Sequence, residues 1–541
     1  MKKLTKNIAL LSAGLATAGA LGTVSADAAK YKTIRWSQSD ILSSMDPSKT
    51  TTNIDFNAIN ATGDGLYRAN QKGDLVLSAA DSVEESEDGL TYTFKLKPDL
   101  KWSNGDPLTA HDFVYGWQRT NDPKTASQYA YLYSGIKNAD AIQKGDEKDL
   151  SKLGVKALDD QTLQVELEKP MPQLKSVLAN APFFPQNEKF VKHAGKKYGT
   201  AAKYTLSSGP YKMKKWSGSS DTYTLVKNKN YYDADVVKTP KIKMATVKEQ
   251  NTGYNLYKSN KLDYTTLSPE QVKKSKNTKA YRTIPEATTA YLQLNEKKVK
   301  AFKNTKVRQA FSYAIDRETF ADKILTGSAT PAKTFTATKL VKDPNTGKDF
   351  AKSAAVKGVN TYNLKKAQKL LKQGMKEAGV KKIKVQMLTD DTSGAKRSAQ
   401  FVQSQYEKLD GVKVTIKTVP FKQRINLSEK RDFDMVVSLW GADYADPSTF
   451  LDLYKSDSSF NEGGWKNKEY DQLLDDAANK NVNDPKARFK DLTKAEQILD
   501  KEAGLVPLYY RSQAALQRTS IKHMVTNTSG ATFDWKWAYK K

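Results

Sequence analysis

The order of apolar and polar positions predicts regular elements along much of the chain. Apolar side chains alternate with polar ones in residues 90–96, and this period of two predicts a β-strand. Residues 103–107, Ser-Asn-Gly-Asp-Pro, predict a turn. Thr109 followed by Asp112 resembles a capping box, so a helix is expected to begin there and to run to about Arg119.

The second half of the chain alternates between helical and extended patterns. Residues 304–316 carry apolar side chains at helical spacing and predict an amphipathic helix. Helices are then expected near 364–371 and 402–409, strands at 383–387, 412–416 and 433–440, and a polar segment at 421–429. Helices and strands that take turns indicate βαβ units around a mostly parallel sheet. This half is therefore predicted to be an α/β lobe.

The segment after the last predicted strand is a candidate ligand site. In open α/β sheets, ligands bind beyond the carboxyl ends of the strands. The strand 433–440 is followed by residues 441–447, Gly-Ala-Asp-Tyr-Ala-Asp-Pro, which combine glycine, aromatic and acidic side chains. A ligand is expected to lie against this segment.

Composition indicates a folded chain without thiol chemistry. The 541 residues, 38% hydrophobic and 10% aromatic, suffice for two or three domains with real cores. The absence of cysteine excludes disulfides, thiolate metal sites and thiol catalysis.

No motif in the sequence points to an enzyme, a cofactor or a metal. His111, His193 and His523 lie far apart with no metal-ligand spacing around them. Nucleophile-elbow, zinc-protease and phosphate-loop motifs are missing. Gly63-Asp64-Gly65 begins like a dinucleotide fingerprint, but Arg68 occupies the place of the third glycine. Paired carboxylates at a site stay open as a source of acid–base chemistry.

The formal net charge of +28 raises the question of an anionic partner. The basic residues are mostly lysines spread along the whole chain, without a nucleic-acid recognition motif, so nucleic acid is not expected. The excess is interpreted as a solvated surface that can adhere to an anionic cell wall or membrane face.

The first residues predict export. Residues 1–6 form a basic segment, 8–21 an apolar segment rich in Ala, Gly and Leu, and 24–26, Val-Ser-Ala, a cleavage site, with 26–28 as a second choice. A membrane anchor is the alternative, but the apolar run is short and weakly hydrophobic. We predict a signal peptide over residues 1–26 and a secreted protein.

Several stretches together resemble the extracellular solute-binding proteins of the oligopeptide, dipeptide and nickel class, family 5, which serve ATP-driven importers. The resemblance is closest to oligopeptide-binding proteins and covers nearly all of the chain after the signal peptide. The stretches that carry it are 101–119 (KWSNGDPLTAHDFVYGWQR), 209–212 (GPYK), 228–232 (NKNYY), 307–310 (VRQA) with 314–317 (AIDR), and 440–444 (WGADY).

The resemblance implies an α/β fold of the type II periplasmic-binding-protein kind, with two lobes that close on a ligand cleft. The first lobe would be discontinuous, 27–55 with 206–290 and 512–541, and an extra domain, 56–205, would be inserted in it. The second lobe would be 291–511, which agrees with the α/β alternation above. The protein is expected to be a monomer.

The resemblance also implies site residues. Asp443 matches the aspartate that holds the α-ammonium of a bound peptide, a suitable role for an acceptor-only carboxylate. Leu439 and Gly441 match positions whose backbone pairs with the peptide, and Leu42 would be a backbone partner from the other lobe. Aromatic side chains of the pockets would be Trp440, Tyr129 and Phe421. The alternative for Asp443 is a turn cap before Asp446-Pro447.

Two departures from the family pattern matter. Some relatives place arginines near the carboxyl end of the peptide, where this chain has Val437 and Ser428. The lipobox cysteine of many Gram-positive relatives is also missing, so retention at the cell surface would depend on charge.

The leading hypothesis is capture of oligopeptides outside the cell and delivery to the membrane permease of an ATP-driven importer, without catalysis. The alternatives are a cationic surface protein that binds acidic wall polymers or host glycans, and a catalyst on this scaffold, for example a peptidase. Nickel-type ligands also remain open within the family.

Overall fold

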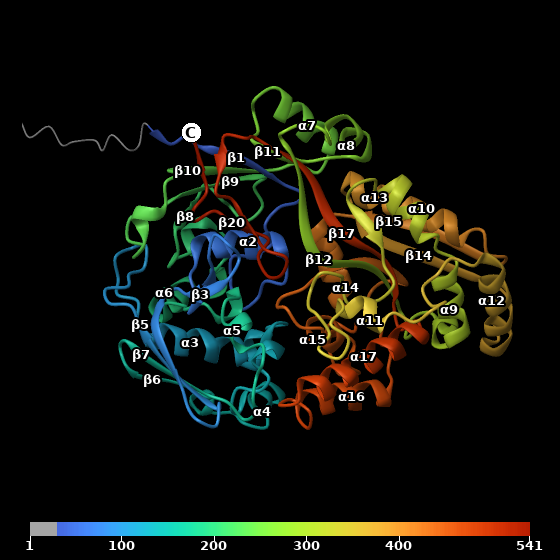
Figure 1. Ribbon diagram of the computed structural model, residues 1–541, viewed down its shortest axis with the longest axis horizontal. Coiled ribbons are helices and arrows are strands. Elements are labelled where there is room, and N and C mark those ends of the chain that lie inside the picture. The colour runs from blue at the N-terminus through green and yellow to red at the C-terminus, as the bar shows by residue number, and fades with distance from the viewer. Residues whose placement is uncertain (1–29) are drawn as a thin grey trace, which may run out of the picture.

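The computed structural model describes residues 30–541, so the predicted signal peptide lies outside the described residues. Figure 1 shows two groups of elements side by side, the earlier part of the chain on the left and the yellow and orange part, about 300–500, on the right. The red C-terminal segment returns to the left-hand group, where the chain began. The first group is therefore built from segments that are far apart in the sequence.

One mixed sheet runs through both groups. Its order is β15 (Val412–Val419), β14 (Ile383–Asp390), β16 (Met435–Gly441), β12 (Tyr281–Leu294), β17 (Val506–Gln517), β11 (Tyr264–Thr266), β1 (Ile34–Gln38), β10 (Lys241–Thr246), β9 (Thr222–Lys227) and β8 (Tyr211–Lys214), with β13 (Ala329–Pro331) also on β17. The two long strands β12 and β17 lie side by side at its middle and connect the groups (Figure 1). The predicted domain boundaries at 290/291 and 511/512 fall inside these two strands.

The parallel pairing predicted for the second half of the chain is confirmed for its three predicted strands, although the sheet as a whole is mixed. β14 pairs in parallel with both β15 and β16, as the alternation of helices and strands requires. β16 pairs antiparallel with β12, and β12 pairs antiparallel with β17. The sheet is mixed because these two connecting strands, which the periodicity did not reveal, run against their neighbours.

Helices of the second group lie near the predicted positions, and capping residues explain where they begin and end. α9 (Thr305–Tyr313) begins after Asn304, whose side chain accepts a bond from the Val307 N–H. α12 (Leu364–Ala378) ends at Gly379, which has a left-handed φ of 64°. The two helices pack closely at Gly374, where an added Cβ would lie 2.8 Å from a Val307 methyl carbon. α13 (Ser393–Tyr406) overlaps the helix predicted near 402–409 but begins and ends earlier, and the polar segment 421–429 is helix α14 (Phe421–Glu429).

The inserted region has a small sheet of its own. Its order is β4 (Ala80–Glu85), β5 (Thr91–Leu96), β7 (Thr162–Glu166) and β6 (Val155–Asp159), all antiparallel. β5 is the strand predicted at 90–96. The predicted helix is α3 (Ala110–Asn121), and the Asp112 carboxylate accepts the Thr109 N–H at 2.9 Å, as the capping box requires.

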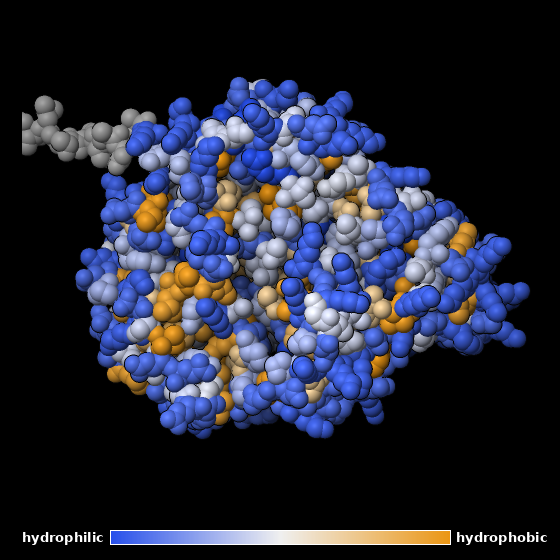
Figure 2. All heavy atoms as spheres, in the orientation of Figure 1, coloured by the Kyte–Doolittle hydropathy of each residue, from blue (hydrophilic) through white to orange (hydrophobic). Residues whose placement is uncertain are grey.

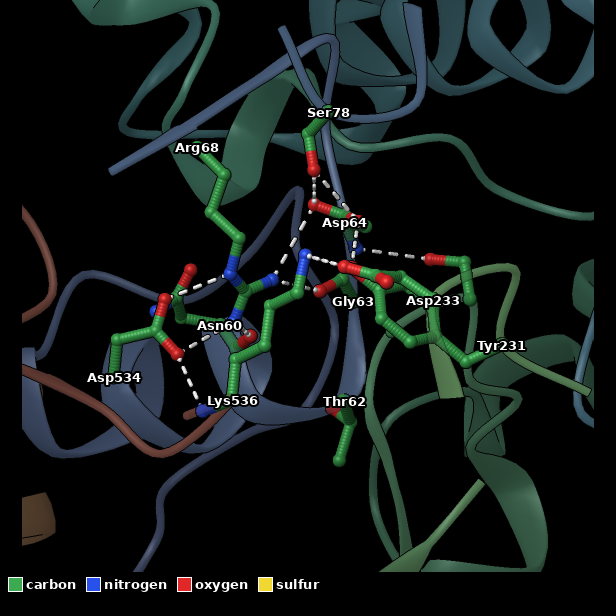
Figure 3. A network of polar contacts seen from close by, with 12 residues as sticks. Asn60, Thr62, Gly63, Asp64, Arg68, Ser78, Tyr231, Asp233, Asp534 and Lys536 are labelled. Atoms are coloured by element: carbon green, nitrogen blue, oxygen red, sulfur yellow. Dashed lines mark hydrogen bonds and ion pairs between the residues drawn. The ribbon is translucent and has the colours of Figure 1, made fainter. Parts of the chain in front are cut away.

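A buried ionic network attaches the C-terminal segment to the region after helix α2 (Asn53–Thr62) (Figure 3). Arg68, 4% exposed, donates from Nε and Nη2 to Asp534 at 2.7 and 3.0 Å and from Nη1 to Asp64 at 3.3 Å. It also donates to the backbone oxygens of Asn60, at 2.7 Å, and Gly63, at 3.2 Å. Arg68, which replaces the third glycine of the partial dinucleotide motif, is thus the centre of a structural ion cluster.

Candidate functional site

A cavity of about 430 Å³ lies between the two groups. The first group lines it with residues of 36–57, 128–129 and 244–269, and the second group with residues of 389–462. β12 and β17 also contribute, at 288–293 and 509–514. Hydrophilic side chains cover most of the face drawn in Figure 2, with smaller hydrophobic patches among them. A ligand in this cavity would therefore be held by both groups at once.

The structure brings six of the seven predicted site residues to this one cavity. They are Tyr129, Phe421, Leu439, Trp440, Gly441 and Asp443. Their roles toward a ligand stay predictions, but their shared position agrees with a single site.

Leu42 does not line the cavity. Its side chain is 1% exposed and belongs to the hydrophobic core. After it, the Ser43 N–H donates to Asp55 at 2.8 Å and the Met45 N–H to the Gly199 oxygen at 2.8 Å, which hold this segment on the first group. Asp40, two residues earlier, lines the cavity instead.

Asp443 is buried and held on several sides. The Tyr129 and Tyr131 hydroxyls donate to its two carboxylate oxygens at 3.1 and 3.4 Å, and its own N–H donates to Thr449 Oγ1 at 2.9 Å. Burial raises the pKa of Asp443 to about 7, although both tyrosine hydrogen bonds lower it. Burial removes water from the Asp443 carboxylate, and a bound cation would stabilise its charge in place of that water.

The contacts of Asp443 also join the two groups. Tyr129 and Tyr131 belong to the inserted region, and Asn180 of the same region donates to the Asp443 backbone oxygen at 3.1 Å. From the C-terminal segment, the Gly530 N–H donates to the Ala442 oxygen at 2.7 Å. The two groups thus meet beside Asp443, and the cavity is closed at this end.

Strand β16 has one open edge along the cavity. Its residues 435–441 all pair with β12 on one side. On the other side β14 pairs only with Met435 and Val436. Residues 437–441, which include Leu439 and Gly441, line the cavity beyond that point. In the described part of the chain no strand pairs with this edge, so its backbone groups are placed to receive an extended ligand.

Aromatic rings cover the end of this edge. The Trp440 ring stacks on Tyr129, with centroids 6.2 Å apart, and meets the edge of Phe460 at 4.8 Å. Further along, the Phe421 ring lies 5.2 Å from the Arg424 guanidinium. Trp440 is 8% exposed and its indole nitrogen has no hydrogen-bond partner in the described residues. The cluster of Trp440, Tyr129 and Phe460 and the ring of Phe421 are two aromatic surfaces that can contact varied ligand side chains.

Sequence reasoning missed several charged residues of the cavity. They are Asp40, Lys248, Asp390, Arg397, Arg424, Glu429, Glu462 and Arg511. The sequence offered a signal only for Arg424 and Glu429, which belong to the polar segment 421–429. A helix that lies between two buried strands in the chain turns its polar side toward solvent or a cavity. Within residues 30–541 no group of three or more metal-ligating side chains is present.

A mixed sheet shared by two lobes, with a cavity and an open strand edge between them, defines a binding protein that holds its ligand between its lobes. Comparison with known proteins gives the family. The bacterial extracellular solute-binding proteins, described as family 5 Middle, match residues 74–462. The chain belongs to this family, whose fold is of the type II periplasmic-binding-protein kind. No helix of residues 30–541 has both the length and the apolar character of a membrane span.

Similar proteins cover almost the whole chain. It is 36% identical to the dipeptide-binding protein of Lactococcus lactis subsp. cremoris, over 95% of each chain. Its structure matches Listeria monocytogenes OppA bound to peptide with a TM-score of 0.90, at 38% identity, over 94% of this chain and 99% of that one.

The comparisons also identify the conformation. A structure of the Escherichia coli murein tripeptide binding protein MppA gives a TM-score of 0.84, at 28% identity, over 94% of this chain and 98% of that one. The unliganded open form of MppA gives only 0.62, at the same identity, over 94% and 97%. The arrangement of the two lobes in this chain therefore differs from that open form.

Proposed function

We propose that this protein captures oligopeptides outside the cell and delivers them to the membrane permease of an ATP-driven importer. The observation that carries the proposal is the open edge of β16, residues 437–441, along the cavity between the lobes. An extended peptide can add to such an edge through backbone hydrogen bonds, which are independent of side-chain identity. The names of the Lactococcus and Listeria relatives, a dipeptide-binding protein and an OppA bound to peptide, support this ligand class.

In this proposal Asp443 fixes the α-ammonium of the peptide. Leu439 and Gly441 offer backbone groups to the first ligand residues, and Trp440 and Tyr129 form one wall with their rings. Phe421 faces a ligand side chain further along. A buried carboxylate with only neutral donors, the Tyr129 and Tyr131 hydroxyls, supports the choice of a cationic group.

The two connecting strands support a division into two lobes. We propose that residues 27–55, 206–290 and 512–541 form the first lobe, 56–205 its inserted domain, and 291–511 the second lobe. Opening would require rotation about β12 and β17, whose pairing is irregular between Pro285 and Thr288. The capture of a ligand and the closure of the lobes would then be one event.

Mass spectrometry of material released by denaturing the purified mature protein is expected to give a ladder of mixed peptides. Backbone recognition predicts such variety because it fixes the chain and leaves the side chains open. A peptide incubated with the protein should be recovered uncut, which separates capture from peptidase activity. A cavity that stays empty after exposure to a peptide library would contradict the proposal.

Residues 1–26 are proposed to direct secretion, and positive charge to retain the protein at the surface. Exposed lysines gather on helix α12, at Lys365, Lys369, Lys372 and Lys376, and the formal net charge of the chain is +28. Each near-surface cation contributes roughly 1 kcal/mol toward an anionic layer. These lysines also favour the second candidate function, binding of acidic wall polymers or host glycans, which can coexist with peptide capture.

Washing cells with about 1 M salt is expected to release most of the protein, because the Debye length falls to roughly 3 Å. A variant with Lys365, Lys369, Lys372 and Lys376 changed to Gln should be released at lower salt, while its peptide affinity stays that of the parent. Protein that remains on cells after the wash would show that another attachment holds it. The amounts in wash and pellet are measured by immunoblot.

A further inference from the structure

Two parallel strands of the first lobe bring an acid and a lysine together at the cavity. β1 and β10 pair in parallel, with Gln38 opposite Thr246 where the two strands end. Asp40 and Lys248 each follow two residues later, and both line the cavity. Because paired parallel strands end at the same edge of a sheet, the two side chains lie close, and Lys248 Nζ is 3.7 Å from Asp40 Oδ1.

Lys248 is bonded more closely to an acid of the second lobe. Asp391 follows directly after β14, and Lys248 donates to both of its carboxylate oxygens at 2.9 Å. The Ser393 hydroxyl also donates to the Lys248 backbone oxygen at 3.4 Å. The Arg397 guanidinium donates to the Gln250 side chain at 2.5 Å. These contacts join the two lobes beside the cavity.

Asp40 is the acid that this arrangement leaves unsatisfied. It is 3% exposed, and its Oδ1 accepts the Ile41 N–H at 2.8 Å, but its Oδ2 has no hydrogen-bond partner within residues 30–541. Burial raises the pKa of Asp40, although the Ile41 N–H and the charge of Lys248 lower it. A buried acceptor without a donor is unfavourable because its lost hydration is not compensated. Asp40 would therefore be stabilised if Lys248 moved toward it.

We propose that Lys248 is a latch between the lobes, which bonds Asp391 when the lobes are together and Asp40 when they separate. Rotation about β12 and β17 would carry Asp391 away, since Asp391 belongs to the second lobe. Asp40 would stay beside Lys248, and a movement of the ammonium by about 1 Å would give it an ordinary charge-assisted hydrogen bond to Asp40. The latch rests on the proposed peptide capture and adds to it a control of lobe closure by the protein's own charges.

Such a latch would change peptide affinity without contacting the peptide. The apparent affinity of a ligand is proportional to the fraction of protein in the binding arrangement. The pair of Lys248 with Asp391 would raise that fraction, and its pair with Asp40 would lower it. Lys248 and Asp391 are 30% and 29% exposed, so their pair is weaker than a buried one and is expected to change affinity by roughly threefold to fivefold. The factor should be the same for every peptide.

Asp391→Asn tests the latch directly, because Asp391 does not line the cavity. In isothermal titration calorimetry of the mature protein with trialanine and trileucine, it should weaken both peptides by the same factor, about threefold to fivefold. Stopped-flow measurements should assign the loss mainly to faster dissociation. Asp40→Asn should instead strengthen both peptides, by about threefold, because it removes the competing partner of Lys248 and the unsatisfied carboxylate. A direct contact of Asp40 with the peptide would give a loss.

The separation of the lobes can also be measured without a peptide. The chain has no cysteine, so spin labels can be attached to cysteines introduced at Lys258 of α7 (Gln250–Lys258) in the first lobe and Lys376 of α12 in the second, both exposed. Double electron–electron resonance then gives the distribution of distances between the labels. Asp391→Asn should increase the share of protein with separated lobes, and Asp40→Asn should decrease it.

An ion pair within one lobe supplies the matched control. Asp475 pairs with Lys455, which is 30% exposed as Lys248 is, but both members belong to the second lobe. Neither of them lines the cavity. Asp475→Asn should therefore change neither the two peptide affinities nor the distances between the labels.

Two failures would be distinguishable. If Asp391→Asn and Asp40→Asn change affinity in the same direction, or if Asp475→Asn weakens it as much as Asp391→Asn does, the latch is wrong and peptide capture stands. If neither peptide binds the wild-type protein, the proposed function fails, and the label distances still decide the latch. Asp391 is 29% exposed, so Asp391→Asn keeps the test valid even if Asp40→Asn does not fold.

Discussion

Asp443→Asn is expected to weaken peptide binding by two to three and a half powers of ten. The substitution keeps the shape of the side chain and removes its charge, so a bound ammonium would be buried without a counterion. Loss of one partner of a buried ion pair costs about 3–5 kcal/mol. The dissociation constant for one alanine tripeptide, measured by isothermal titration calorimetry on mature wild-type and variant protein, gives the effect directly.

An N-acetylated tripeptide is the matched control for Asp443. It lacks the ammonium, so the wild-type protein should bind it as poorly as the variant binds the free peptide. Asp443→Asn should distinguish the free from the acetylated tripeptide far less than the wild type does, because the variant already lacks the carboxylate of the ion pair. Binding by Asp443→Asn within threefold of the wild type would remove the assigned anchor and leave the turn-cap interpretation.

The same carboxylate gives peptide binding a pH dependence with a defined sign. Burial raises the pKa of Asp443 to about 7 in the closed protein, and a neighbouring ammonium would lower it. A carboxylate whose pKa falls on binding must lose its proton, so affinity decreases as the pH falls below 7. The α-amino group of the peptide itself loses its proton near pH 8, so the comparison stays below that pH. Titrations with alanine peptides between pH 7.3 and pH 5 should show this decrease in the wild type and not in Asp443→Asn.

The local pattern of apolar and polar residues predicted those elements that have one buried and one exposed face. The strands β14 and β15 alternate buried and exposed side chains, and their periods of two were visible in the sequence. β12 was not visible because its second half, from Ala287 to Leu294, is buried on both faces and its first half contains Pro285. Strands covered on both sides lose the alternation that marks a strand. The link between the lobes was therefore the part that required the structure.

The site was predictable only where it coincides with a strand end. Asp443 follows β16, and both the strand-end rule and the family resemblance pointed to it. Glu462 lies outside any helix or strand and lines the cavity, where Gln293, 169 residues away in the chain, donates to it. Leu42 was placed by resemblance alone; its side chain lies in the hydrophobic core, and the role of its backbone stays a prediction.

Ligand specificity in this protein is therefore expected to depend on loops and the helix α14 more than on the sheet. The sheet supplies an edge that any peptide backbone can use. Side chains of a ligand would instead be distinguished by charged residues of the cavity. Arg424 and Glu429 come from α14, and Glu462 comes from the segment after α15 (Ser448–Leu451). Such segments tolerate substitution better than a buried strand does.

Arg68→Ala is expected to destabilise the fold by about 3–5 kcal/mol, the cost of leaving buried carboxylates without their cation. Asp64 and Asp534 are 3% and 1% exposed, and Arg68 is bonded to both (Figure 3). Asp534 lies on the C-terminal segment, so the loss should first detach that segment from the region after α2. Urea unfolding at pH 7, followed by tryptophan fluorescence, should show an earlier first transition because Trp535 adjoins the broken pair.

Lys192→Ala is the matched control, since it removes a cation from the exposed pair with Glu188 on α6 (Glu188–Ala194), where the side chains are 70% and 53% exposed. Water already solvates both charges there, so its effect should stay within about 0.5 kcal/mol. A double change, Arg68→Ala with Asp534→Asn, should recover part of the loss, because one of the two carboxylates then needs no cation. Equal urea midpoints for Arg68→Ala and Lys192→Ala would mean that water enters the broken network and compensates Asp64 and Asp534. The network would then hold the C-terminal segment in position without contributing measurably to the free energy of unfolding.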